Sequence, residues 1–211
     1  GENMKLLLVI LFLVNVNLLG SKIDNKGYDK KSNQYYKQYK KEFDRLPLKN
    51  KKKILEAYYT NEAYDLGFTM AGTMFLENRG KDTSYSNKSG RNKNIHKNGM
   101  ITYDCGDYGI NTMTYLKSIG KATKNHKKHI EACKVLSKDK LLNLTLALDH
   151  YKYGLEISNG NIRKSWNIYN TGNKKIINDR IYQMKGIIMV LEQEVKNNKL
   201  LDYKVALNDK K

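Results

Sequence analysis

The sequence predicts a mainly helical single domain with a cleft and a small β-hairpin at the cleft edge. Apolar residues recur at helical spacing in several segments, whereas no segment shows the sustained alternation of a long strand. The 211 residues are 40% hydrophobic and include one proline, which is enough for one domain with a core of its own. Two or three short strands near residues 95–112 are expected to form the hairpin.

The amino-terminal end predicts export. Lys5 precedes an apolar run, and small residues follow this run near Gly20. This order is typical of a secretory signal peptide over residues 1–20, which indicates a periplasmic or secreted protein. Retention as a membrane anchor is the alternative, but two asparagines interrupt the run and it is short for a bilayer core. We therefore expect no stable membrane span after signal cleavage.

The net charge of +18 predicts attraction to a polyanion, which includes nucleic acid, an anionic membrane and an acidic cell-wall polymer. The lysines are spread over nearly every segment. A nucleic-acid binder would need clustered arginines or a platform of aromatic side chains, and the sequence has neither pattern. Export also argues against a role on intracellular nucleic acid, so we expect no nucleic-acid partner.

The chain after the signal peptide divides into three parts. Residues 21–49 are polar, basic and rich in tyrosine, and we expect an exposed or loosely docked arm with a short amphipathic helix. Residues 50–193 carry the helical patterns of the domain, and residues 194–211 form a polar tail that is expected to fray.

The stretch over residues 66–80 contains the strongest candidate for a catalytic group. In a helix, Met70, Met74 and Glu77 share one stripe, so an ionisable carboxyl group lies on an apolar face. Such a carboxyl group is either paired or keeps its proton through a raised pKa, as a general acid requires. A glycine soon follows, which predicts that Glu77 lies in the last turn at the rim of a cleft. The alternative is an ion pair with Arg79 or a lysine on a solvated face.

Residues 80–103 lose all periodicity and predict a long polar loop beside the cleft. His96 lies in this loop without a second His or Cys at metal-ligand spacing, so we expect no metal and no cofactor. Helical stripes return further along the chain, at Leu141 to Tyr151, Ile162 to Tyr169 and Ile177 to Leu191.

Cys105 and Cys133 are the two cysteines of the sequence. In an oxidising compartment such a pair suggests one disulfide, which would join the turn beside the cleft to the following helix. A cysteine nucleophile is the weaker alternative, because no histidine lies at a motif-like position.

Three motifs together resemble a known superfamily. An acid ends the helix in FLENRGK, a Gly-x-x-x-Ile-Asn turn leads into Thr-x-x-Tyr-Leu, and WNIYNTG follows near the end of the domain. Over about residues 50–190 their order and spacing resemble the lysozyme-like superfamily of lytic transglycosylases and goose-type lysozymes. Each motif alone also fits a simpler role as a tight turn, a helix stop or a core face.

The resemblance can be carried over residue by residue. Glu77 matches the catalytic glutamate of the family, although the family serine after it is Asn78 here. The family turn is matched by Gly106, Ile110 and Asn111. Its glutamine position reads Gly109, so a substrate-contacting amide is missing in this register.

A second register of the turn stays open. It aligns this chain with the Asp-Tyr-Gly-Ile of lysozyme-type turns through Asp107, Tyr108, Gly109 and Ile110. The later motif matches Tyr-Asn-x-Gly without a gap through Tyr169, Asn170 and Gly172. The resemblance implies that Tyr169 and Asn170 position the glutamate or the sugar. The backbone from Gly106 to Asn111 is expected to line the cleft, so the residues expected to bind substrate are Gly106, Tyr108, Ile110, Asn111, Tyr169 and Asn170.

The resemblance implies a lytic transglycosylase that cleaves the MurNAc-GlcNAc β-1,4 bond of peptidoglycan with Glu77 as both acid and base. A hydrolytic muramidase is the alternative, and it would need a second carboxylate from Asp82, Asp104 or Asp107. The third hypothesis is a non-catalytic exported basic protein that binds glycan. The expected partners are glycan strands and, as for small relatives, a cell-envelope or secretion apparatus; we expect a monomer.

Overall fold

The computed structural model describes residues 30–86, 90–172 and 179–196. The predicted signal peptide at residues 1–20 lies outside them, as do residues 197–211 of the predicted tail.

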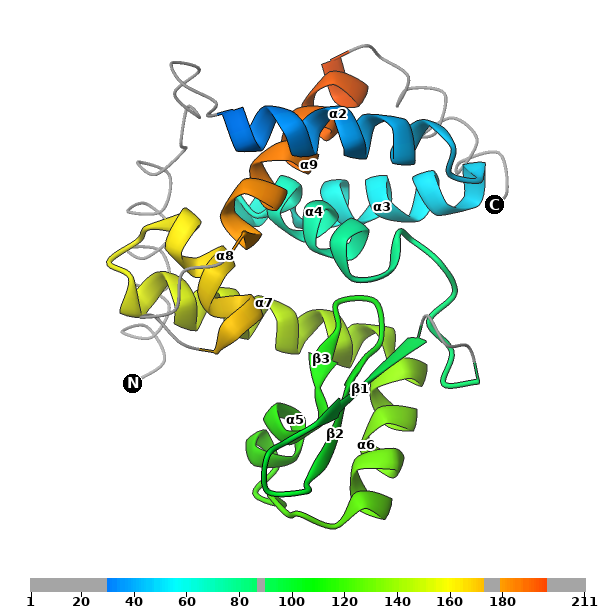
Figure 1. Cartoon of the computed structure of the whole chain (residues 1–211), viewed down its shortest axis with the longest axis vertical. Helices are drawn as coiled ribbons and strands as arrows, with labels where there is room; N and C mark the ends of the chain where they lie inside the picture. Colours follow the sequence, from blue (N-terminus) through cyan, green and yellow to red (C-terminus); the bar gives the residue numbers. More distant parts are fainter. Residues whose placement is uncertain (1–29, 87–89, 173–178, 197–211) are drawn as a thin grey trace, which may run out of the picture.

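The described chain is mainly helical and carries one three-stranded antiparallel sheet, as the fold class predicts at this level (Figure 1). The elements are α2 (Lys30–Asp44), α3 (Leu48–Asn61), η2 (Glu62–Tyr64), α4 (Gly67–Asn78), β1 (Arg91–Ile95), β2 (Ile101–Cys105), β3 (Ile110–Asn111), α5 (Thr112–Ser118), α6 (His126–Lys138), α7 (Lys140–Ile157), α8 (Ile162–Thr171) and α9 (Arg180–Lys196). Figure 1 shows α2, α3, α4 and α9 together at the top, and the sheet with α5 and α6 at the bottom. We call these groups the helical lobe and the sheet lobe; α7 and α8 lie between them.

Helix α4 is the buried centre of the helical lobe. Met70 and Met74 are 0% and 4% exposed, so the predicted apolar stripe faces the core. Gly72 lets α4 approach α9 closely, because a Cβ atom there would lie 3.2 Å from side-chain atoms of Met184 and Ile187. The elements α3 and α9 therefore cover α4 from two sides and fix the direction in which its last turn points.

In the described part of residues 21–49, the predicted amphipathic helix is present as α2, but the prediction of an exposed or loosely docked arm is wrong. Its helix α2 packs along α9, and Tyr39 and Phe43 are 3% and 1% exposed. Gly186 permits this approach, because a Cβ atom there would lie 2.7 Å from the Cβ of Tyr35. The aromatic residues at helical spacing bury one face while the lysines stay outside, so the domain begins before residue 50.

The sheet supplies the hairpin expected near residues 95–112, with a first strand that starts earlier. β1 pairs with β2, and β2 pairs with β3, both antiparallel. The disulfide between Cys105 and Cys133 joins the end of β2 to α6, and both cysteines are fully buried. This bond fixes the start of the turn that follows β2.

Within the described ranges, no helix is both long and apolar enough to cross a membrane.

Candidate active site

A cavity of about 350 Å³ lies where the two lobes meet α7 and α8. Its lining residues come from α4, the sheet, the turn before β3 and the helices α5, α7 and α8: Glu77, Asn94, Asp104, Gly109, Ile110, Asn111, Thr114, His150, Tyr169, Asn170, Thr171 and Gly172. Residues from all three sequence motifs therefore meet in one polar cavity. Of the residues expected to bind substrate, Gly106 and Tyr108 are not in this lining.

Glu77 occupies the last turn of α4, which ends at Asn78. Arg79 adopts a left-handed conformation with φ of 59° and donates its backbone N–H to the carbonyl of Phe75. This ending leaves the Glu77 side chain 19% exposed at the cavity wall. The carboxyl group thus reaches the cavity from an otherwise buried helix.

Glu77 is ion-paired, and its partner is a residue that the sequence analysis missed. Arg180, in the first turn of α9, donates from Nη2 to Glu77 Oε1. The expectation that Arg79 or a lysine fills this place is wrong, because Arg79 Nε donates to Glu42 Oε2 at 2.7 Å. An arginine at the start of an apolar helical stripe was the available signal for Arg180, whose side chain is only 6% exposed.

The surroundings of Glu77 raise the pKa of its carboxyl group. Burial raises the pKa of Glu77 above its ordinary value of 4.5, and the negative charge of Asp104 adds to this rise. The positive charge of Arg180 opposes it without reversing it. A carboxyl group with a raised pKa is able to carry a proton to a bound ligand.

Gly109 gives the Glu77 carboxyl group the space that it occupies. A Cβ atom at Gly109 would lie 2.6 Å from Glu77 Oε2, and the φ of this glycine is +64°. Both the close contact and the left-handed backbone require glycine. The glycine at position 109 therefore has a local physical cause.

Tyr169 acts on the turn that carries Gly109. Its hydroxyl donates to the backbone carbonyl of Tyr108 at 2.7 Å, and its ring stacks on Tyr151 with centroids 4.3 Å apart. The Tyr151 hydroxyl in turn hydrogen-bonds to Thr73 on α4 at 2.6 Å. The resemblance implied that Tyr169 holds or orients the glutamate; its hydrogen bond to the Tyr108 carbonyl instead fixes the turn beside Glu77.

Of the three candidates for a second carboxylate, Asp104 is the one that lines the cavity with Glu77. Asn94 and Asn111 each donate from Nδ2 to one of its carboxylate oxygens, at 2.8 and 2.7 Å. Asp82 lies in the exposed loop after α4 and accepts from the backbone N–H and the hydroxyl of Ser84. The two amides fix the orientation of the Asp104 carboxylate in the cavity lining.

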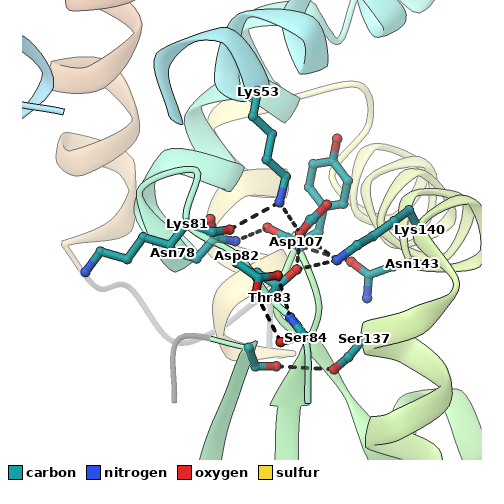
Figure 2. A network of polar contacts seen from close by, with 12 residues as sticks. Lys53, Asn78, Lys81, Asp82, Thr83, Ser84, Asp107, Ser137, Lys140 and Asn143 are labelled. Carbon is teal, nitrogen blue, oxygen red and sulfur yellow. Dashed lines mark hydrogen bonds and ion pairs between the residues drawn. The ribbon is translucent and has the colours of Figure 1, made fainter. Parts of the chain in front are cut away.

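The third candidate, Asp107, lies in a polar network of its own (Figure 2). Its Oδ1 accepts from Lys53 at 2.7 Å, from Lys140 at 3.2 Å and from Thr83, while its backbone carbonyl accepts from Asn78 at 2.6 Å. The carboxylate is 9% exposed and does not line the cavity. Asp107 therefore fastens the turn to α3, α4 and α7.

We expect Asp107→Asn to lower the free energy of unfolding by about 2 kcal/mol at pH 7, because two lysines lose a buried carboxylate partner. The network lowers the pKa of Asp107 below 3.8. Its contribution is therefore present at pH values above 3.8 and is lost as the pH falls through the lowered pKa. Urea denaturation at a series of pH values measures both effects, and the difference from wild type should shrink in acid.

Asp82→Asn is the matched control for Asp107→Asn, since it removes an exposed carboxylate from the loop after α4. We expect it to change stability by less than about 0.5 kcal/mol. Equal losses in the two variants would contradict a special role for Asp107.

No protein-family model matches the chain, and comparisons with curated proteins and with solved structures found no match. The function is therefore inferred from the chemistry of the cavity. In the described part of the chain, no three His, Cys, Asp or Glu side chains are grouped to hold a metal ion. The lining combines one carboxyl group of raised pKa, a second carboxylate and several neutral amides and hydroxyls. Such a set suits proton transfer to an oxygen of an uncharged, hydroxyl-rich ligand.

Proposed function

We propose that the chain is an exported lytic transglycosylase with a lysozyme-like fold, which cleaves the MurNAc-GlcNAc β-1,4 bond of peptidoglycan. One observation carries the proposal: Glu77 shares a single cavity with Ile110, Asn111, Tyr169 and Asn170, the residues to which the family resemblance assigns substrate contacts. The net charge of +18 supports attraction to anionic wall polymers. The periplasmic or secreted location is part of the same proposal.

In the proposed reaction, Glu77 donates its proton to the glycosidic oxygen, and the bond from this oxygen to C1 of the muramic ring breaks with both electrons on oxygen. The resulting Glu77 carboxylate faces the positive charge that develops on C1. It then accepts the proton of the muramic 6-hydroxyl, whose oxygen bonds to C1 and closes a 1,6-anhydro ring. No water is consumed, and Glu77 ends in its starting form.

A hydrolytic muramidase is the second candidate, and the position of Asp104 favours it. Asp104 lines the same cavity as Glu77 and is held by two asparagine amides. In hydrolysis a second carboxylate activates water or stabilises the oxocarbenium ion. We favour the transglycosylase because Glu77 alone supplies the acid and the base that it needs.

Mass spectrometry of the products released from peptidoglycan sacculi by the purified protein tests the proposal. We expect anhydro-muropeptides, which are lighter by one water than hydrolysis products. Asp104→Asn should retain this product and most of the rate. Reducing-end products that disappear in Asp104→Asn would instead identify a muramidase, and no products would favour a glycan-binding protein.

A further inference from the structure

A buried arginine lies behind the proposed catalytic acid. Arg180 is 6% exposed and donates from Nη2 to Glu77 Oε1, across 103 residues of sequence. The start of α9 is fixed from outside, because Asp179 accepts from Lys31 at 2.5 Å and from the Tyr35 hydroxyl at 3.0 Å. The guanidinium group is therefore held in place by the packing of α2 and α4 on α9.

The ion pair makes the two oxygens of Glu77 different. Oε1 accepts from the guanidinium group, whereas Oε2 lies next to Gly109, which lines the cavity. An arginine donates only and stays protonated, so it cannot take the acidic proton. When Glu77 is protonated, the hydrogen belongs on Oε2, since Oε1 already accepts an N–H.

Other charged and titratable groups face Glu77 from the surrounding elements. Asp104 on β2 raises its pKa, and Arg79 at the end of α4 lowers it, although the Arg79 guanidinium is bonded to Glu42. Tyr151 on α7 and Tyr169 on α8 have raised pKa values and stay neutral. Burial lowers the pKa of His150, which also lines the cavity. In the turn, the Asp107 carboxylate is paired with Lys53 and Lys140. Arg180 is, among the described residues, the cation bonded to Glu77.

We infer that Arg180 is a positioning residue for the proposed cleavage: it holds Glu77 by Oε1, directs the proton on Oε2 into the cavity, and stabilises the carboxylate that remains after proton donation. This inference rests on the proposed function. A planar guanidinium group fixes the direction of the contact, which a lysine ammonium would not. Substitution of Arg180 by lysine or by methionine therefore separates the effect of its charge from its effect on the orientation of Glu77.

Two variants, Arg180→Met and Arg180→Lys, test the inference through kinetics on a fragment of peptidoglycan glycan. We expect Arg180→Met to lower kcat by about a hundredfold, with KM changed by less than about threefold, because the lost contact is strongest once the carboxylate forms. The pH at which the activity falls on the alkaline side should move upward, because the positive charge of Arg180 no longer lowers the pKa of Glu77. In Arg180→Lys the alkaline pH limit should stay near that of wild type, because the positive charge remains. Its kcat should fall, because a lysine does not fix the orientation of the Glu77 carboxyl group.

Carbon-13 NMR of the Glu77 carboxyl group supplies a readout that needs no turnover. The resonance of Glu77 is identified by its absence in Glu77→Gln. The pH midpoint of its titration should be higher in Arg180→Met than in wild type. Arg79→Met is the matched control, since it removes an arginine paired with Glu42, and its midpoint should move much less. If Arg180→Met does not fold, Arg180→Lys carries the test through its loss of kcat.

An unchanged Glu77 midpoint in Arg180→Met, or a wild-type kcat in either variant, would overturn the inference. An inactive wild-type protein would defeat the proposed function and the role of Arg180 in cleavage together. In that case the pH midpoint of the Glu77 resonance would still show whether Arg180 acts on Glu77, because this measurement needs no activity.

Discussion

Glu77→Gln should lower the rate of release of muropeptides from sacculi by about 10³-fold while the protein stays folded. Glutamine keeps the shape of the side chain, and its amide oxygen is able to accept the N–H of Arg180 that Glu77 Oε1 accepts now. It has no acidic proton to give, so the glycosidic oxygen leaves unprotonated. Chromatography of the released products over time measures the rate, and circular dichroism checks the fold.

Glu192→Gln provides the matched control for this prediction. Burial also raises the pKa of Glu192, but its side chain belongs to α9 and is not part of the cavity lining. We expect its activity to equal that of wild type. If Glu77→Gln kept the wild-type rate, the carboxyl group of Glu77 would not be the acid.

The pH dependence of the reaction follows from the same residue. The donor must be protonated, and burial raises the pKa of Glu77 above 4.5, so the rate falls as the pH rises through this raised value. The sign for stability is the same: protonated Glu77 stabilises the fold below pH 4.5, and this contribution is lost as the pH rises through the raised pKa. Glu77→Gln should remove both effects.

The sequence predicts the helices better than it predicts what surrounds them. The stripe of Met70 and Met74 places Glu77 on the buried helix α4, because helical spacing is a local property. The partner of Glu77 depends on how α9 packs on α4, and spacing within α4 carries no information about it. Charged residues are mostly exposed, so Arg180 does not stand out among 39 lysines and arginines.

The expectation that charged residues are exposed also explains why residues 21–49 were predicted to be an exposed or loosely docked arm. The positive charge of residues 21–49 favours an exposed arm, but a helix with aromatic residues on one face is able to bury that face and leave its lysines outside. The burial of this face depends on the packing of α2 along α9, which lies more than a hundred residues later in the chain. The closeness of Gly109 to Glu77 is also long-range in sequence. The sequence therefore indicated only that Gly109 lacks the amide side chain of the family glutamine.

Gly109→Ala should reduce activity by about a hundredfold, because the new methyl group would displace the proposed catalytic acid. The added Cβ would lie 2.6 Å from Glu77 Oε2, which is too close for either group to stay in place. The backbone φ of +64° adds strain of about 1–2 kcal/mol. Measured rates should fall more than the stability loss explains, and the Glu77 carboxyl resonance should shift in carbon-13 NMR.

Gly120→Ala separates strain from contact. Gly120 has a φ of +68°, but a Cβ atom there would meet no atom within 4 Å. It should therefore lose a similar amount of stability and keep its activity. In a Glu77→Ala background, the stability cost of Gly109→Ala should fall toward that of Gly120→Ala, because the carboxyl group that the methyl group meets is absent. Equal activity in Gly109→Ala and Gly120→Ala would show that backbone conformation alone selects glycine at position 109, and that the space beside Oε2 is not used in the reaction.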